Sequence, residues 1–340
     1  MSKADTDVEP LATQTLRAVL LAGNVFIKHP AASAVDAPFC ATVKAGSQNL
    51  ALIRDLATTT LGEALEKTIL TAFQGRVGDH NDLAIPGAAA LASALSDRLG
   101  LSLHVIGTPE PALNTDWRAE LDAAMPALQA LSRHFESIFE QGARPLTVLT
   151  RCAVALATLP IVARHRPDAC VVWLDAHADL NAPETSSSGY LGGMAVSGAA
   201  GLWESGLGAG LALNNVILLG ARDIDPAERK LINAADIQII RPQAKLVAAT
   251  TDAIGGRPVY VHLDCDVLNP GIVPSDYQVE GGLTLSDLRA VSEVLAKSEV
   301  VGVEIAEFQN AWEIGGPPAS PERLLSAIGP LVERFRSART

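Results

Sequence analysis

The sequence predicts an α/β protein with a doubly wound, mainly parallel sheet and helices on both of its faces. Three observations predict this class. From residue 68 onward, short apolar runs alternate with amphipathic helical stretches, which implies right-handed βαβ crossovers. Apolar residues make up 48% of the chain but aromatic residues only 4%, which suits helices packed on a sheet of small branched side chains. Acidic clusters follow two of the predicted strands, where ligands gather in such sheets.

The predicted elements follow one another in regular order. Strands are expected at 68–73, 101–106, 145–149, 170–174, 215–220, 237–240, 259–263 and 300–304. Helices are expected at 85–99, 117–140, 153–165, 227–235 and 285–296. The first helix opens with Pro86 and Gly87, and the second strand is ended by Gly107 and Pro109.

The first 66 residues do not share this alternation. Residues 18–27 suit either a helix end or a strand, and residues 41–66 carry leucine and isoleucine at helical spacing. We therefore expect two parts: an N-terminal extension of unknown role at 1–66 and an α/β domain at 67–340.

Composition excludes several classes of function. The formal net charge is −12 and no lysine or arginine run occurs, which argues against nucleic acid or an anionic membrane as partner. Four unpaired cysteines, the acidic start of the chain and the lack of a long apolar run predict a cytoplasmic protein.

The stretch from Val171 to Asn181 carries the clearest chemistry. Asp175, His177 and Asp179 follow a strand at spacings of two, so they project from one face as ligands for a divalent cation. The alternative is a polar strand edge whose acids cap the next helix.

A second acidic pair follows the strand at 259–263. Asp264 and Asp266 share a face by the same alternation, while Cys265 points away and is expected in the core. Five ligands, four of them carboxylates, exceed what one ion needs and favour a two-metal site. Oxygen-rich ligation with one histidine favours Mn²⁺ over Zn²⁺.

These two motifs, Asp-Ala-His-Ala-Asp-Leu-Asn and His-Leu-Asp-Cys-Asp-Val-Leu-Asn-Pro, resemble the signatures of the arginase (ureohydrolase) family over roughly residues 68–336. His262 and Asn269 replace a serine and an aspartate of the second signature. The resemblance implies that Asp175 and Asp264 bridge two Mn²⁺ ions. It also implies that a hydroxide held between the ions attacks the guanidinium carbon. Each ion would keep further protein ligands: His177 and Asp266 on one ion, Asp179 on the other.

The resemblance also implies the substrate contacts. Asn181 and Ser188 would hold an amino-acid carboxylate, Asp225 and Glu228 would serve the α-amino group, and Glu307 would orient the guanidinium. Each alone suits a surface acid or a helix cap, and Glu228 suits the structural interpretation better. Together they indicate a small α-amino acid with a guanidino tail.

Two departures argue against plain arginase activity. Cys152, in Thr-Arg-Cys, stands in the place of a histidine ligand of the family, and a thiolate matches Mn²⁺ less well, so one ion would be weakly held. An inert buried thiol is the alternative. Tyr190 and Gly192 stand where arginases carry an asparagine and a histidine that transfers protons. Losing a general acid costs about 10²–10⁴ in rate.

Both departures are similar to the branch of Nω-hydroxy-L-arginine amidinohydrolases of D-cycloserine biosynthesis, which release hydroxyurea and L-ornithine. The hydroxyl group makes the guanidine less basic, so the leaving nitrogen needs less protonation. We expect hydrolysis of hydroxyarginine or a close guanidino amino acid, with Tyr190 near the vacated histidine position. The alternatives are an arginase or agmatinase type of ureohydrolase with another guanidino or formimino substrate, and a metal-poor binding module. Homo-oligomerisation is left open, since arginase relatives often form trimers or hexamers.

Overall fold

The computed structural model describes residues 18–21, 24–27, 67–242 and 245–336. The chain divides into two compact units, Met1–Ala64 and Leu65–Thr340. In the first unit, β1 (Ala18–Leu21) and β2 (Asn24–Ile27) pair antiparallel, so the strand interpretation of residues 18–27 is confirmed. The helical spacing predicted at 41–66 lies outside the described residues.

The second unit is built on an eight-stranded sheet. Its order is β4-β3-β5-β10-β9-β6-β7-β8, and every neighbouring pair is parallel. The strands are β3 (Thr68–Phe73), β4 (Leu103–Ile106), β5 (Arg144–Val148), β6 (Cys170–Leu174), β7 (Val216–Leu219), β8 (Gln238–Ile240), β9 (Val259–Asp264) and β10 (Val300–Ala306). All eight predicted strands are therefore confirmed, with ends shifted by at most two residues.

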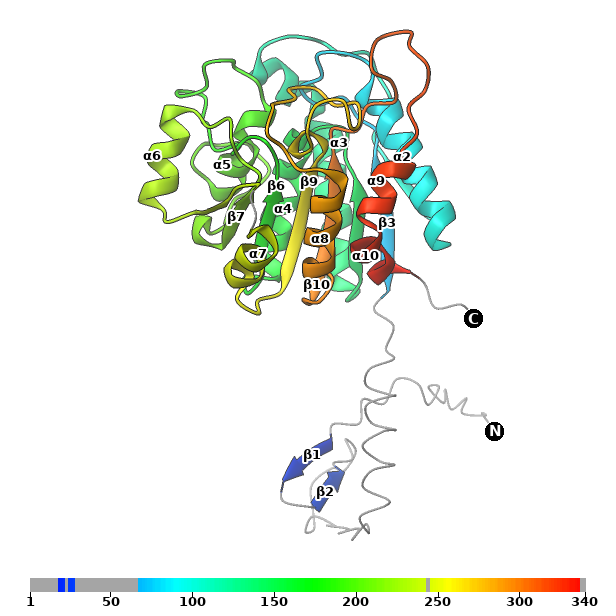
Figure 1. Cartoon of the computed structure of the whole chain (residues 1–340), viewed down its shortest axis with the longest axis vertical. Coiled ribbons are helices and arrows are strands. Elements are labelled where there is room, and N and C mark those ends of the chain that lie inside the picture. The colour runs from blue at the N-terminus through cyan, green and yellow to red at the C-terminus, as the bar shows by residue number, and fades with distance from the viewer. Residues whose placement is uncertain (1–17, 22–23, 28–66, 243–244, 337–340) are drawn as a thin grey trace, which may run out of the picture. The chain divides into compact units, whose positions relative to one another are not determined.

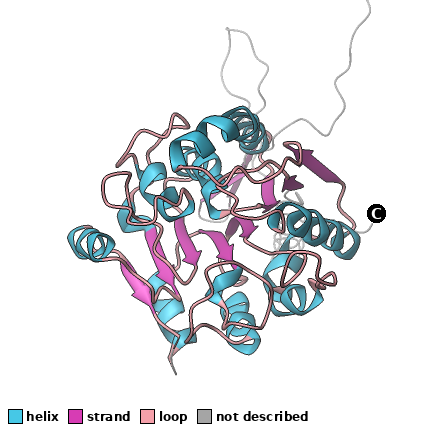
Figure 2. Cartoon of the chain, turned by 90° about the horizontal axis from the view of Figure 1, so that it is seen from above, coloured by secondary structure: helices cyan, strands magenta, loops and turns pink. Residues whose placement is uncertain are grey.

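Helices cover both faces of this sheet, as Figures 1 and 2 show. One face packs against α2 (Ala84–Leu99), α7 (Leu246–Ile254), α8 (Leu285–Leu295), α9 (Glu322–Ala327) and α10 (Gly329–Val332). The other packs against α3 (Trp117–Glu140), α4 (Ala155–His165), α5 (Ala195–Ala200) and α6 (Pro226–Ala234). The predicted doubly wound class is confirmed.

Alternation along the central strands produces the two cores. Val259, Val261 and Leu263 of β9 belong to the first core, whereas Tyr260 belongs to the second. Because successive strand side chains point to opposite faces, a strand buried on both sides reads as a continuous apolar run.

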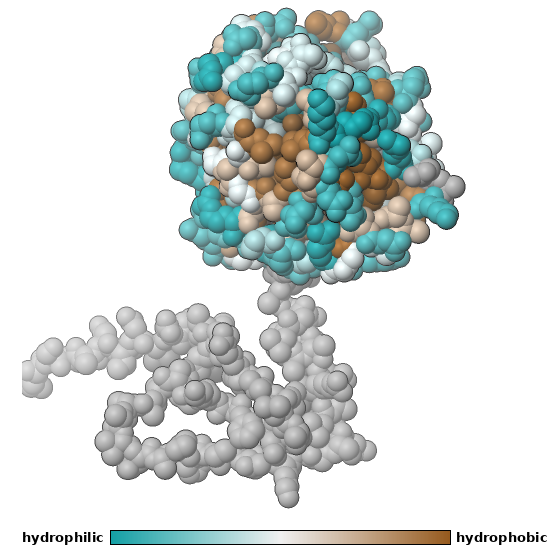
Figure 3. All heavy atoms as spheres, turned by 90° about the vertical axis from the view of Figure 1, so that its left-hand side faces the viewer, coloured by the Kyte–Doolittle hydropathy of each residue, from teal (hydrophilic) through white to brown (hydrophobic). Residues whose placement is uncertain are grey.

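Figure 3 shows an apolar area surrounded by hydrophilic residues on the side of this unit that carries α6.

Local sequence explains several helix ends. The carboxylate of Asp116 accepts hydrogen bonds from the backbone N–H of Arg118 and Ala119 and so caps the start of α3. Thr284 and Asp287 form a capping box at the start of α8. Helices α5, α7, α9 and α10 were not predicted. In α7, Val247, Thr250, Thr251 and Ile254 are β-branched and weaken the helical signal.

No helix of the described residues is long and apolar enough to cross a membrane. The cysteines within the described part of the chain, Cys152, Cys170 and Cys265, are free and buried. Cys40 lies outside it.

Candidate metal centre and substrate pocket

Four neighbouring strands, β5, β10, β9 and β6, form the middle of the sheet, and their carboxyl ends meet at one edge. Chemistry-bearing side chains follow each of these strands. They are Cys152 after β5, Glu307 after β10, Asp264 and Asp266 at the end of β9, and Asp175, His177 and Asp179 after β6. Residues far apart in the sequence therefore meet where an open parallel sheet binds ligands.

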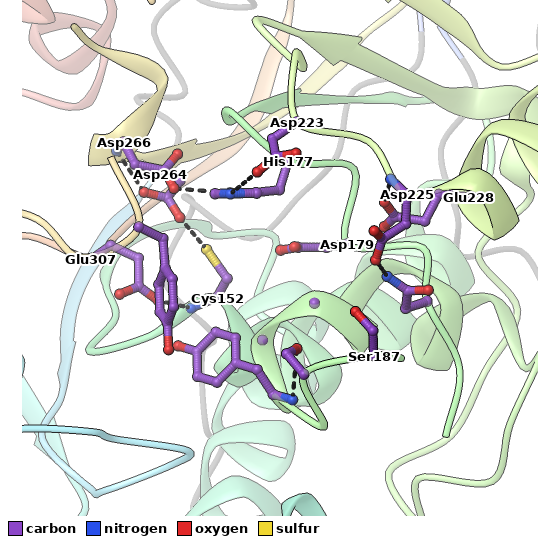
Figure 4. A pocket seen from close by; sticks show the side chains of 16 residues that line it. Cys152, His177, Asp179, Ser187, Asp223, Asp225, Glu228, Asp264, Asp266 and Glu307 are labelled. Atoms are coloured by element: carbon purple, nitrogen blue, oxygen red, sulfur yellow. Dashed lines mark hydrogen bonds and ion pairs between the residues drawn. The ribbon is translucent and has the colours of Figure 1, made fainter. Parts of the chain in front are cut away.

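A cavity of about 240 Å³ opens at this edge. Eleven of the twelve predicted site residues line it: Cys152, His177, Asp179, Asn181, Ser188, Tyr190, Asp225, Glu228, Asp264, Asp266 and Glu307. The twelfth, Asp175, is buried and lies against the lining residue His177. Figure 4 shows Cys152, His177, Asp179 and Asp264 pointing toward a common space, with Asp225, Glu228 and Ser187 on the far side of Asp179.

His177 and Cys152 make short contacts with the acidic residues. His177 Nδ1 lies 3.0 Å from Asp266 Oδ2 and 3.2 Å from Asp175 Oδ1. The Cys152 thiol lies 2.9 Å from Asp264 Oδ2 and 4.0 Å from Asp175 Oδ2. Three groups among the described residues are compact enough for an ion: Asp175 with His177 and Asp266, Cys152 with Asp264 and Glu307, and Cys152 with Asp175 and His262.

This crowding of acids changes their ionisation. Burial raises the pKa of Asp264 well above its ordinary value, and the charges of Asp266 and Asp175 raise it further. Burial followed by the charge of Asp175 likewise raises the pKa of Asp266 to about 7. Asp179 shows the same direction, since burial and then Asp175 raise its pKa. Keeping these carboxylates ionised in the metal-free protein therefore costs free energy.

The donor set fits divalent cations. Four buried aspartates surround one space, and His177 is the basic side chain hydrogen-bonded among them. Although burial opposes its ionisation, contacts with Asp175 and Asp266 raise the pKa of His177. A bound cation would compensate the like charges that a single imidazole does not. Oxygen-rich ligation with one imidazole suits Mn²⁺, and the thiol of Cys152 is the soft exception.

Two of these residues have unusual backbone conformations. Asp179 has φ +51° and Glu307 has φ +65°, both in the left-handed region that ordinary residues avoid. Such conformations cost about 1–3 kcal/mol and persist where the surroundings enforce them. Close packing helps at Glu307, because Gly87 of α2 leaves room for the carbonyl of the following Phe308 that no β-carbon would allow.

Glu307 is already held by two donors. Its Oε1 accepts a hydrogen bond of 2.9 Å from the backbone N–H of Cys152, and its Oε2 accepts one of 2.8 Å from Arg151 Nη1. Arg151 is fully buried and also pairs with Asp276 and Asp79. Burial raises the pKa of Glu307, and the Arg151 guanidinium lowers it in part. The carboxylate predicted to orient a guanidinium therefore already has a cationic partner.

The far side of the pocket carries the predicted amino-acid contacts. Asn181 Nδ2 donates to Asp225 Oδ2 at 2.8 Å, which places an amide and a carboxylate side by side. Glu228 accepts backbone hydrogen bonds from Leu180 and Asp225 through its two oxygens. Glu228 therefore joins the loop after β6 to the start of α6. This agrees with the alternative given above, in which Glu228 has a structural role such as a helix cap.

Tyr190 occupies the vacated position. A β-carbon placed on Gly192 would overlap Cε1 of Tyr190 and lie 3.0 Å from its Cζ. The hydroxyl of Tyr190 is buried and has no hydrogen-bond partner among the described residues. Burial and then the charge of Glu307 raise the pKa of Tyr190, so this phenol keeps its proton.

Sequence reasoning missed several residues of this site. Arg151 was read only as a neighbour of Cys152, because its partners Asp79, Asp276 and Glu307 are separated from it by 72, 125 and 156 positions. Tyr277 lines the pocket from the loop between β9 and α8, and its ring lies 4.9 Å from that of Tyr190. Thr-Arg-Cys was the available signal for Arg151, since a charged residue at a strand end needs a partner. No local signal marked Tyr277.

Comparisons with known proteins identify the family. The sequence profile of the arginase family matches residues 60–316. The N(omega)-hydroxy-L-arginine amidinohydrolase of Streptomyces lavendulae is 42% identical over 269 residues, which cover 79% of this chain and 96% of that protein. An arginase of Bacillus caldovelox is 29% identical over 199 residues, covering 53% of this chain and 66% of its own length.

Solved structures share the fold. The crystal structure of arginase from Bacillus subtilis superposes with a TM-score of 0.67 at 24% identity, covering 81% of this chain and 99% of the other. At that identity the likeness concerns the fold alone.

Proposed function

Because this chain belongs to the arginase family of hydrolases, we propose that it is a binuclear-manganese amidinohydrolase that cleaves Nω-hydroxy-L-arginine, or a close guanidino amino acid, to L-ornithine and hydroxyurea. The observation that carries the proposal is the assembly of the predicted ligands around one pocket beside Glu307. The relative from Streptomyces lavendulae, which carries the name of this activity, supports the substrate.

The proposed ligands are distributed over two positions. Two Mn²⁺ ions would be held by Asp175, Asp264, His177, Asp266, Cys152 and Asp179, with His177 and Asp266 at one position and Cys152 and Asp179 at the other. Bound there, the ions would supply Lewis acidity and a nucleophile at neutral pH by lowering the pKa of water.

The chain's own residues would orient the substrate. Glu307 accepts hydrogen bonds from the guanidino nitrogens, and its anchoring by Arg151 and the Cys152 N–H fixes its direction. Asn181, Ser188 and Asp225 face the amino-acid end of the substrate, with Glu228 holding that side of the pocket in place. Tyr190 Oη, protonated and without a hydrogen-bond partner in the part of the chain that the structure describes, donates a hydrogen bond to the departing nitrogen.

Two features of the pocket favour a hydroxyguanidine over a guanidinium. Tyr190 fills the space of a side chain at position 192, so no imidazole is available there to protonate the leaving group. Arg151 neutralises part of the charge of Glu307, which weakens the attraction for a full cation. A less basic hydroxyguanidine depends less on both interactions.

The test is a release assay with Mn²⁺ added, in which hydroxyurea and urea are measured over a panel of guanidino amino acids and agmatine. We expect hydroxyurea from hydroxyarginine to form at least 100-fold faster than urea from arginine, following the usual weight of a general acid, about 10²–10⁴. Faster urea release from arginine or agmatine would replace the proposed substrate. No turnover by folded, metal-loaded protein would refute the activity.

The proposal also includes the cell compartment of the protein and the division of its chain into domains. We place the enzyme in the cytoplasm, because the described cysteines are free thiols. We further propose that residues 67–340 form the metallohydrolase domain and that residues 1–66 are an extension outside it.

A further inference from the structure

A buried chain of contacts runs behind the pocket, from Glu304 on β10 through His262 on β9 to Cys152. His262 Nε2 lies 3.1 Å from Cys152 Sγ, and His262 Nδ1 lies 2.7 Å from Glu304 Oε1. His262 and Glu304 are both completely buried. His262 does not line the pocket, but one of its ring nitrogens, the Cys152 sulfur and a carboxylate oxygen of Asp175 all lie within 4.8 Å of one another.

The orientation of the His262 ring is fixed by Glu304, which is itself held by hydrogen bonds from other residues. Glu304 accepts hydrogen bonds from the hydroxyls of Tyr260 and Thr158 at 2.7 and 2.8 Å, and it accepts a third from His262 Nδ1–H. With the proton on Nδ1 directed at the carboxylate, Nε2 faces the sulfur of Cys152. A carboxylate orients metal-binding histidines in the same way, but here the second ring nitrogen faces the Cys152 sulfur.

Trp173 completes the arrangement. Its indole stacks on the His262 ring with centroids 3.5 Å apart and planes 7° from parallel. The same indole donates a hydrogen bond of 3.0 Å from Nε1 to Asp175 Oδ2. The register of β6, β9 and β10 places Trp173, His262 and Glu304 side by side, so one stacked pair of rings touches two of the proposed ligands, Cys152 and Asp175.

We propose that His262 is a positioning residue that holds the Cys152 sulfur toward the acidic cluster, and that Glu304 fixes His262 for this purpose. The inference rests on the proposed function, in which Cys152 is a metal ligand. The Cys152 thiol, a softer ligand than imidazole, thus keeps a fixed place in the site because it is contacted by a histidine from β9, which β10 separates from β5. Losing a group of this kind lowers metal affinity about 10- to 100-fold.

The experiment measures metal binding without substrate, in full-length protein loaded with Co²⁺. Cobalt reports on sulfur through the thiolate-to-metal charge-transfer absorption, and Mn²⁺ dissociation constants are measured in parallel. His262→Phe keeps a ring for Trp173 to stack on but removes both nitrogens. We expect Co²⁺ and Mn²⁺ affinities to fall about 10- to 100-fold and the charge-transfer band to weaken or shift.

Two further variants serve as rescue and control. His262→Gln carries an amide at about the place of Nε2 and should restore most of the band. Tyr260→Phe removes another donor to Glu304 from the same face of β9 but does not contact Cys152, so its band should match the wild type. If His262→Phe does not fold, Glu304→Gln replaces it, with a loss in the same direction.

A double-mutant cycle separates positioning from a general structural role. In the Cys152→Ser background, His262→Phe should cause little further loss of metal affinity, because the group it positions is absent. Equal losses in both backgrounds, or an unchanged band in folded His262→Phe, overturn the inference. Hydrolysis by chelator-treated protein that depends on Cys152 also overturns it, since the thiol would then be a nucleophile. If the wild type binds metal through sulfur but releases no hydroxyurea, the proposed function fails and the positioning role of His262 stands.

Discussion

The ring of Tyr190 lies in the space that any side chain at position 192 would need, so Tyr190 and Gly192 form one unit of the pocket. A histidine cannot be restored at 192 without moving the tyrosine. We therefore expect Gly192→His alone to lower the melting temperature, as overpacking of a buried site costs about 1–3 kcal/mol. Tyr190→Asn with Gly192→His should recover that stability.

The same double variant should also change the reaction. With an imidazole near the leaving group, urea release from arginine should rise relative to hydroxyurea release from hydroxyarginine, within the range of about 10²–10⁴ expected for a general acid. Steady-state kinetics with both substrates measure the ratio, and Tyr190→Asn alone is the control. A ratio equal to that of the control would show that position 192 does not supply the proton.

Arg151 should determine the preference for a less basic substrate head group. Replacing it removes the cation paired with Glu307, so that a substrate guanidinium becomes the cationic partner of this buried carboxyl group. Because Arg151→Met would strand the buried carboxylate of Asp79, the variant combines it with Asp79→Asn. We expect kcat/KM for arginine to rise relative to hydroxyarginine. Arg151→Lys retains the charge and should keep the wild-type ratio, and a shift of equal size in both variants would contradict the electrostatic explanation.

Cys152 should control retention of one metal ion. If the thiol is a ligand, Cys152→His should retain more Mn²⁺ after dialysis, because imidazole suits Mn²⁺ better than sulfur does. Elemental analysis gives the metal content per chain, and Cys170→Ala, a buried free thiol at the opposite end of β6, is the matched control. Unchanged metal content in a folded Cys152→His variant would remove Cys152 from the proposed site.

The metal-free protein should lose stability as pH rises from about 4 to 8. The pKa of Asp266 is raised from 3.8 to about 7 by burial and by Asp175, so between these values the folded state binds more protons than the unfolded state. Unfolding then becomes easier as pH rises through this window. Raised pKa values at Asp179, Asp264 and His177 act in the same direction.

Melting temperatures of chelator-treated protein across this pH range test the trend. Adding Mn²⁺ should reverse it, because metal binding requires deprotonated ligands and strengthens as pH rises. Asp266→Asn should flatten the curve of the metal-free protein. A melting temperature that rises with pH in the absence of metal would contradict the charge crowding described here.

Removal of residues 1–64 should leave the hydrolase intact. The second compact unit begins at Leu65 and contains the whole pocket. We expect kcat and Mn²⁺ content of the shortened protein to lie within about twofold of the full chain, since every residue that lines the pocket belongs to the second unit. A large loss of activity, with the fold retained, would show that the extension takes part in the site.

The predictability of the fold followed from its buried parallel strands. Runs such as Val259–Asp264 are recognisable because both faces of the sheet are covered, and Pro86 marks where helix α2 begins. Helix α7 could not be predicted because its β-branched residues carry a weak helical signal. Only its packing against α8 and the sheet stabilises it.

The site, like the fold, has a part that the sequence predicts and a part that it does not. Asp175, His177 and Asp179, like Asp264 and Asp266, are close in sequence, so strand alternation alone grouped each set. The union of the two groups at one edge follows from parallel topology, which the sequence also predicted. Local spacing is thus sufficient to find the proposed acidic ligands.

Tertiary structure alone decided what surrounds those ligands. The pairing of Arg151 with Glu307, the contact of His262 with Cys152 and the overlap of Tyr190 with position 192 each join residues from different segments or depend on the rotamer of a packed ring. No periodicity encodes such contacts, because they arise from sheet register and close packing. The sequence by itself determined which acids gather at the edge of the sheet, and the packed structure determined which neighbours hold them.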